Sequence, residues 1–227
     1  MKKFRFINEY VMIESFKVEQ PYHICVIDIG SPKLGNLGWC LIDVYANQEF
    51  TGDNLDDLFP LLTNAVKKNG LILGLEAPLF VPLRPDLILA TKGRKGEGRR
   101  PWSAGAGAQV LAMNLPIMVY ILKGIQSFQP DISYFLNEDG FTAKSNEIMI
   151  FEALVSGKDK GSSHINDAQI MAYSCLEYSK RNKLPPSILE REEHTEYFNL
   201  SAAALLRCSL LDDSKTISLP SPIYKPN

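Results

Sequence analysis

The stretch YHICVIDIG, residues 22–30, decides the fold of this chain. Its compact run of apolar and β-branched residues predicts a buried strand that ends at Asp28, and the Gly-Ser-Pro sequence that follows predicts a turn. An acidic side chain in this position is either a turn former or a buried carboxylate. A buried carboxylate needs an ion pair, hydrogen bonds or a metal ion, so Asp28 is a candidate for a functional site.

The residues after this turn predict a hairpin. Residues 38–45 (GWCLIDVY) suit an antiparallel partner for the first strand, and residues 48–51 allow a short third strand. The first part of the sheet is therefore expected to be antiparallel.

A helix and a further strand follow the hairpin. Asp53 or Asn54 can cap the helix, although Pro60 predicts a later start or a kink. Residues 71–80 (LILGLEAPLF) predict a buried strand that carries Glu76 near its end. Glu76 is either a solvated side chain on an edge strand or a second buried acid.

This order of elements fits a mixed sheet in which the strand ending at Asp28 lies beside the strand ending at Glu76. Both carboxylates would then stand at the carboxyl ends of neighbouring strands, where the strand order reverses. Open α/β sheets bind ligands at that point.

A third acid lies on a helix expected from Ser162 or Ser163 to about residue 180. Helical spacing places Asp167 on the same face as the residues that must pack on the sheet, which are Ala168, Met171 and Cys175, together with His164. Asp167 either points toward the sheet or simply complements the helix N-terminus. His164 is either a site residue or a surface histidine at a helix start.

Three acids converging from two strand ends and a helix predict a metal site. Mg²⁺ and Mn²⁺ prefer oxygen ligands, and such ions can activate water for phosphodiester cleavage. Without a metal ion the clustered carboxylates of Asp28, Glu76 and Asp167 would repel one another.

A glycine-rich basic loop follows the Glu76 strand closely enough to lie over this site. Its candidates for substrate binding are Arg94, Lys95, Arg99, Arg100 and Trp102. Arginines can contact phosphate oxygens and the indole can stack on a base. The alternative is a solvated, flexible loop.

The remaining segments predict a single domain with two extensions. A helix is expected over 104–128, broken or bent near Pro116, with strands over 133–136 and 147–153 and a last helix over about 200–211. The expected division is an N-terminal extension (1–20), one domain (21–212) and an irregular C-terminal tail (213–227).

The motifs VIDIG, GLEAPLF, EIMIFEA and HINDAQIMAY, in this order, resemble the RNase H-like superfamily, and most closely the predicted nuclease family called domain of unknown function 429. The resemblance spans about residues 22–211. It implies an α/β fold with a five-stranded mixed sheet in the order 3-2-1-4-5 and helices on both faces.

The same resemblance assigns site residues. It implies catalytic Asp28, Glu76 and Asp167 with His164, and a fourth metal-binding acid at Glu152. The family usually has Asp-Ala-Pro where this chain has Glu76-Ala-Pro, whereas RuvC-like junction resolvases use glutamate in this strand. The spacing of His164 and Asp167 also resembles a helix motif of some resolvases.

Composition restricts the possible partners and compartments. The 227 residues carry a net charge of −2, so nucleic acid would need a local basic patch. Four widely spaced cysteines predict reduced core residues rather than a zinc site or disulfides. No signal peptide or apolar run of roughly 18 residues is evident, which favours a cytoplasmic protein that does not enter membranes.

Three functions remain open at this point. The first is a nuclease that uses Mg²⁺ or Mn²⁺ on DNA or RNA. The second is a non-catalytic RNase H-like binding domain. The third is a phosphotransferase of the actin-like and sugar-kinase group, suggested by Asp28-Ile-Gly30, although 227 residues leave no room for the duplicated domain of that group. The sequence does not indicate an oligomeric state.

Overall fold

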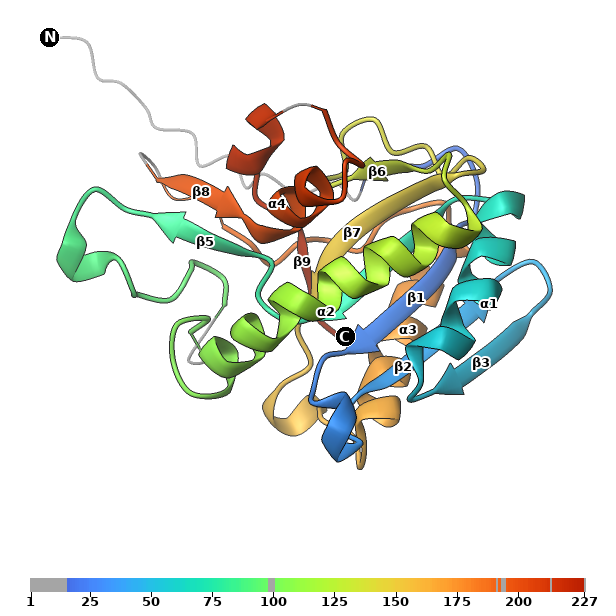
Figure 1. Cartoon of the computed structure of the whole chain (residues 1–227), viewed down its shortest axis with the longest axis horizontal. Coiled ribbons are helices and arrows are strands. Elements are labelled where there is room, and N and C mark those ends of the chain that lie inside the picture. Colours follow the sequence, from blue (N-terminus) through green and yellow to red (C-terminus); the bar gives the residue numbers. More distant parts are fainter. Residues whose placement is uncertain (1–15, 98–100, 191, 193–194, 213, 227) are drawn as a thin grey trace, which may run out of the picture.

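A mixed β-sheet forms the centre of the protein (Figure 1). The computed structural model describes residues 16–97, 101–190, 192, 195–212 and 214–226. The strands of the central sheet are β1 (His23–Asp28), β2 (Gly38–Asp43), β3 (Gln48–Gly52), β4 (Leu71–Glu76), β6 (Ser133–Phe135), β7 (Glu147–Ala153) and β9 (Ile223–Tyr224). Their order is β3-β2-β1-β4-β7-β6, and β9 also pairs with β7.

The pairing directions confirm the expected α/β fold class. Strands β1, β2 and β3 are antiparallel neighbours, whereas β4 is parallel to both β1 and β7. With β7 as the fifth strand, the core has the RNase H-like order 3-2-1-4-5. The outer strands β6 and β9 add to this core.

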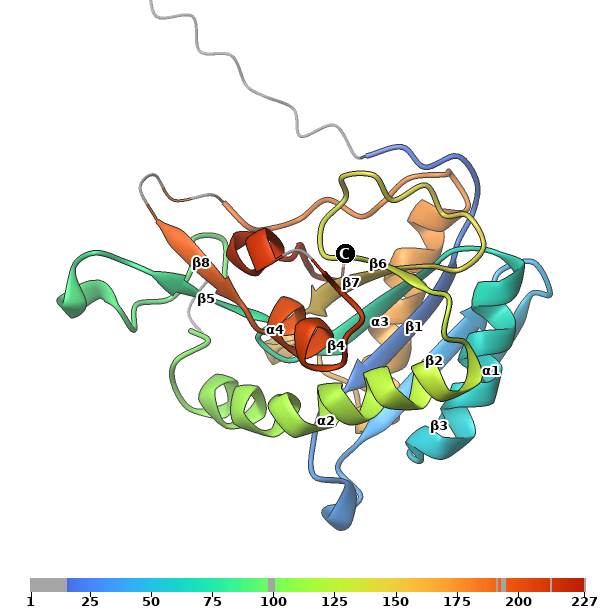
Figure 2. The same cartoon turned by 45° about the horizontal axis from the view of Figure 1, so that its top comes forward.

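Helices cover both faces of the sheet, as expected (Figures 1 and 2). One face packs against α1 (Leu55–Lys68), α2 (Ala106–Phe128) and α4 (Leu200–Arg207). The other face packs against α3 (His164–Ser179). Because successive side chains of a strand point to opposite faces, Cys25 and Ile27 of β1 join the first core, while Ile24 and Val26 join the second.

Two helices continue as single elements through the prolines at which the sequence predicted a later start, a kink or a bend. The side chain of Asn54 caps α1 by accepting a hydrogen bond from the Asp56 backbone N–H, and the helix continues through Pro60 without a later start. Helix α2 likewise continues through Pro116 as one element of 23 residues.

Two parts of the chain contain strands that the sequence did not predict. Between β4 and the basic loop, β5 (Phe80–Leu83) pairs with β8 (Glu196–Asn199) in a small antiparallel sheet. In the C-terminal tail, the fully buried Ile223 and Tyr224 of β9 pair with β7. The tail is therefore part of the domain, which corrects the expected boundary at residue 213. The expected N-terminal extension lies mostly outside the described residues, but Lys17 forms a β-bridge with Lys183.

Helix α2 differs from the expectation that no apolar segment is long enough to span a membrane. Within the described residues it alone is long and apolar enough to cross a membrane by length and composition, and 28% of its most apolar window is buried. Core helices pass the same test. The four cysteines are all buried and free, as predicted.

Candidate metal centre

Asp28 and Glu76 are brought together by the pairing of β1 and β4. They are direct partners in the parallel register of these strands. Val26 lies two residues before Asp28, and Ile72 lies four residues before Glu76; both belong to the core on the α3 face. Side chains an even number of residues apart in a strand point to the same face. Strand periodicity therefore directs both carboxylates toward α3.

Asp167 reaches the same place because α3 approaches the sheet closely at its first turn. The Ser163 hydroxyl accepts a hydrogen bond from the Asn166 backbone N–H and so fixes the start of the helix. Gly38 of β2 makes the approach possible, since a Cβ atom there would lie only 2.3 Å from the backbone nitrogen of Ile165. Asp167 is consequently buried, with 4% of its surface exposed.

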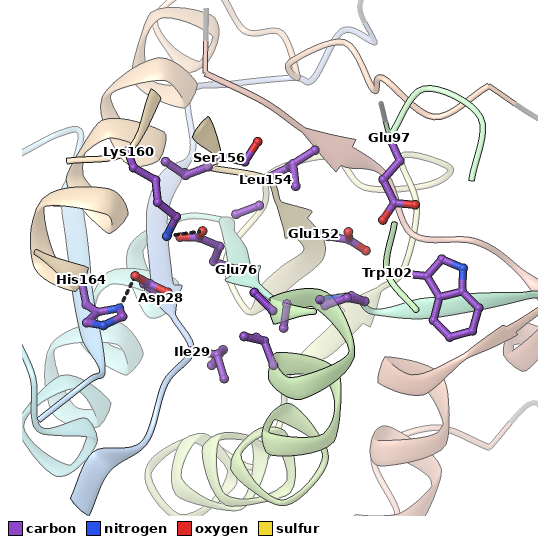
Figure 3. Close-up of a pocket in the computed structure, with 17 residues that line it drawn as sticks. Asp28, Ile29, Glu76, Glu97, Trp102, Glu152, Leu154, Ser156, Lys160 and His164 are labelled. Atoms are coloured by element: carbon purple, nitrogen blue, oxygen red, sulfur yellow. Dashed lines mark hydrogen bonds and ion pairs between the residues drawn. The ribbon is translucent and has the colours of Figure 1, made fainter. Parts of the chain in front are cut away.

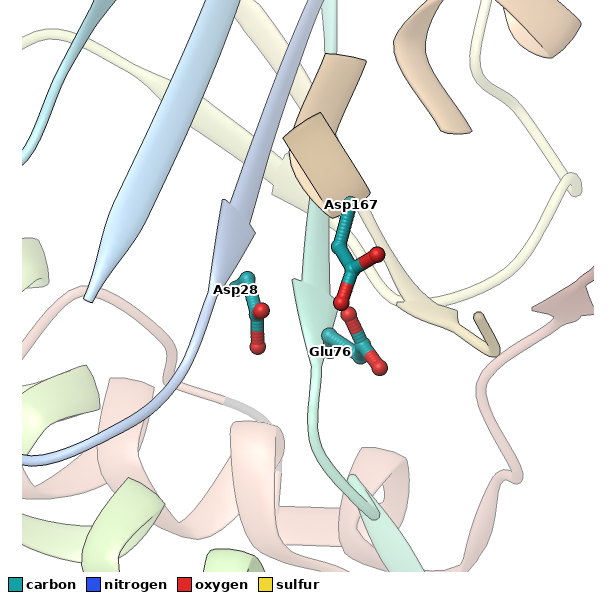
Figure 4. Close-up of side chains that lie close together, drawn as sticks. All are labelled: Asp28, Glu76 and Asp167. Carbon is teal, nitrogen blue, oxygen red and sulfur yellow. The ribbon is translucent and has the colours of Figure 1, made fainter. Parts of the chain in front are cut away.

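The three carboxylates face one another from β1, β4 and α3 (Figure 4). One oxygen from each of Asp28, Glu76 and Asp167 lies within 4.8 Å of the other two. The structure thus brings together the acids that the sequence predicted.

Hydrogen bonds and ion pairs from neighbouring residues hold this cluster. Nδ1 of His164 lies 2.5 Å from Oδ2 of Asp28. The Lys160 ammonium donates to Oδ2 of Asp167 at 3.0 Å and lies 3.4 Å from Oε1 of Glu76. Figure 3 shows the contacts of His164 with Asp28 and of Lys160 with Glu76.

The cluster is electrostatically strained without additional positive charge. Burial raises the pKa of Asp28, and burial together with the nearby Asp28 charge raises the pKa of Glu76 to about 9. For Lys160, burial lowers the pKa, but the charges of Glu76 and Asp167 outweigh burial and raise it overall.

The donor set fits a hard divalent cation. All three groups offer carboxylate oxygens, which Mg²⁺ and Mn²⁺ prefer. Oε2 of Glu76 is buried and has no hydrogen-bond partner among the described residues. An unpaired buried carboxylate oxygen is costly, and a cation would remove that cost.

A cavity of about 270 Å³ extends from the carboxylates. His164 and Lys160 line it beside the acids, and Trp102 lies across it (Figure 3). The walls between them are mainly apolar, with contributions from Pro78 and Val110. A ligand held at the acids would therefore also contact apolar surface and an indole ring.

Glu152 does not join the cluster, which corrects its expected role as a fourth metal ligand. It is paired with Leu75 rather than Glu76 in the register of β4 and β7, so its side chain starts on the opposite face of the sheet. Its carboxylate accepts hydrogen bonds from Arg94 at 2.6 and 2.8 Å and from the Leu79 backbone N–H at 3.0 Å.

Arg94 is likewise a structural residue rather than a surface contact for phosphate. Its side chain is 1% exposed, bonds to Glu97 as well as Glu152, and lies over the Phe80 ring at 4.5 Å. This buried group anchors the loop that the sequence predicted to be solvated or substrate-binding.

The other loop candidates are placed differently. Lys95 is exposed and does not line the cavity, while Trp102 does. Arg99 and Arg100 lie outside the described residues. Lys160 was not singled out from the sequence, because its surroundings (Lys158-Asp-Lys-Gly161) indicate only a turn.

The fold and this site define an RNase H-like α/β domain with a buried acidic triad that could bind metal. Comparison of the chain with protein-family models, curated proteins and solved structures gives no match. The strand order supports the RNase H-like fold, and no family match supports the resemblance to domain of unknown function 429.

Proposed function

We propose that this protein is a metal-dependent nuclease in which Asp28, Glu76 and Asp167 hold Mg²⁺ or Mn²⁺. The observation that carries the proposal is the convergence of these carboxylates within 4.8 Å, with a buried oxygen of Glu76 left without a partner. An ordinary structural cluster would satisfy that oxygen with a protein donor.

A bound divalent cation would supply Lewis-acid polarisation of a phosphate and a lowered pKa for water. The chain's own residues would hold and orient the reactants. Asp28 fixes the ring of His164, whose side chain is 37% exposed and lines the cavity, so the imidazole can accept or donate a proton there. Trp102 offers a surface on which a base can stack.

The test is cleavage of a panel of nucleic acids by the full chain. Single-stranded, duplex, hybrid and branched DNA and RNA would be incubated with Mn²⁺, and we expect metal-dependent cleavage of at least one. Asp28→Asn should lose nearly all activity, whereas the matched control Asp131→Asn, at an exposed position away from the cavity, should retain it. No cleavage across the panel, or full activity in Asp28→Asn, contradicts the proposal.

One observation favours a non-catalytic binding domain as a second candidate. The Lys160 ammonium already contacts Glu76 and Asp167, so the acids have a partner other than metal. This alternative predicts that calorimetry detects no Mn²⁺ binding, whereas the nuclease proposal predicts binding that Asp28→Asn abolishes.

A further inference from the structure

Lys160 places a positive charge inside the acidic cluster. It lies between the 3₁₀ turn at Gly157–Asp159 and α3, and 41% of its side chain is exposed, so the ammonium enters from the solvent side. Its contacts are Oδ2 of Asp167 at 3.0 Å and Oε1 of Glu76 at 3.4 Å.

The contacts divide the cluster into two sides. Both oxygens of Asp167 are engaged, Oδ1 by the Gly161 backbone N–H at 2.5 Å and Oδ2 by Lys160. On the other side, the described contacts leave Oε2 of Glu76 without a partner and engage Asp28 through Oδ2. The capacity to bind a cation is therefore concentrated between Asp28 and Glu76.

We infer that Lys160 takes the place of a second metal ion, so that the site binds a single divalent cation. The ion would lie toward Asp28 and Glu76 and share the carboxylate of Asp167 with the ammonium, which stays beside Asp167 as the second positive charge that faces a substrate phosphate. This inference rests on the proposed function, because it assumes that the carboxylates bind metal.

Charge balance supports this arrangement. One divalent ion and one ammonium together neutralise three carboxylates, whereas a second divalent ion would leave excess positive charge in a buried site. Two-metal sites hold their ions about 3.5–4 Å apart. A second ion bound at Asp167 would lie against the Lys160 ammonium, whose positive charge would repel it. Lysine suits the role because its ammonium is a compact charge with three donors.

The experiment counts Mn²⁺ ions by isothermal titration calorimetry on the full chain. We expect about one ion per chain in the wild type and about two in Lys160→Gln, as in sites with two metals. Lys160→Arg keeps the charge and should keep a single ion. Lys158→Gln is the matched control at a nearby exposed lysine and should also keep a single ion.

The possible results separate this inference from the proposed function. Two ions in the wild type, or a single ion of unchanged affinity in a folded Lys160→Gln, overturns the role of Lys160 alone. No Mn²⁺ binding to the wild type overturns both. Thermal melting identifies a variant that fails to fold, in which case Lys160→Met provides the same comparison.

Discussion

The guanidinium of Arg94 donates two hydrogen bonds to the carboxylate of Glu152, and both side chains are almost fully buried. Removing one member of such a pair leaves an uncompensated buried charge. We therefore expect Arg94→Met to lower the free energy of unfolding by about 3–5 kcal/mol, measured by urea denaturation. Lys95→Met, at the exposed neighbouring position, should change it by less than about 0.5 kcal/mol. Equal effects of the two substitutions would contradict the structural role of Arg94.

Glu152 and Glu76 provide a direct comparison of two acids beside one cavity. Glu76→Gln removes a proposed ligand and should weaken Mn²⁺ binding by at least ~10-fold, as even loss of a group behind a ligand does. Glu152→Gln should leave the affinity nearly unchanged, because its carboxylate is bound to Arg94, which keeps Glu97 as a partner. Calorimetry measures the Mn²⁺ affinity of both variants. A similar loss of affinity in Glu152→Gln would show that Glu152 is a metal ligand after all.

Gly38→Ala should damage the metal site without touching a carboxylate. The added Cβ would lie 2.3 Å from the backbone nitrogen of Ile165, so the first turn of α3 must shift and carry His164 and Asp167 with it. We expect Mn²⁺ affinity to fall by at least ~10-fold, as when a metal ligand is misplaced.

The matched control for this substitution is Gly35→Ala. Gly35 has a positive φ of 66° but an open surrounding, so the variant should lose stability through backbone strain and keep its metal affinity. Loss of affinity in both variants would show that general destabilisation, and not the position of α3, causes the effect.

Because His23 is buried, we expect the free energy of unfolding to depend on pH for a reason unrelated to the metal site. Burial lowers its pKa, and although the Asp43 charge acts in the opposite direction, the net shift is downward. As the pH falls below about 6.5, the unfolded chain binds a proton that the folded chain resists, so the free energy of unfolding decreases.

The measurement compares the wild type with His23→Asn by urea denaturation in a chelator. The stability difference in favour of the wild type should shrink between pH 8 and pH 5, by at most about 1.4 kcal/mol per pH unit. The other titrating groups near His23, Asp43 and Lys68, are common to both proteins. A difference that stays constant with pH would mean that the folded and unfolded chains bind protons at His23 equally.

The order of the core strands was implied by the resemblance to the RNase H-like superfamily, and the strands themselves could be predicted because each carries its own apolar pattern. The small sheet of β5 and β8 could not, since its partners are brought together only by tertiary contacts. Strand β9 was missed because Ile223 and Tyr224 lie beside Pro222, in a sequence that indicates irregular structure. Its burial depends on a neighbour, β7, far away in the sequence.

The acidic cluster was predictable for a similar reason: the ends of strands and the face of a helix follow from local periodicity. The same periodicity places Glu152 on the α1 face of the sheet, away from the other acids, because Ile148 and Ile150 of its strand belong to the core on that face. Its pairing with Arg94 links residues that are 58 positions apart, and no local pattern indicates such a contact. No local pattern indicates the contacts of Lys160 with Glu76 and Asp167 either.

The first turns of α2 line the cavity with small side chains, those of Ala106 and Val110, and with Gly107. The helix is anchored by other residues further along, including Met118 and Ile121. A larger residue at position 106 would therefore narrow the cavity while leaving the carboxylates and the core in place. The cavity wall formed by α2 and the carboxylates on β1, β4 and α3 therefore lie on separate elements, so each can be altered, by evolution or by engineering, without the other.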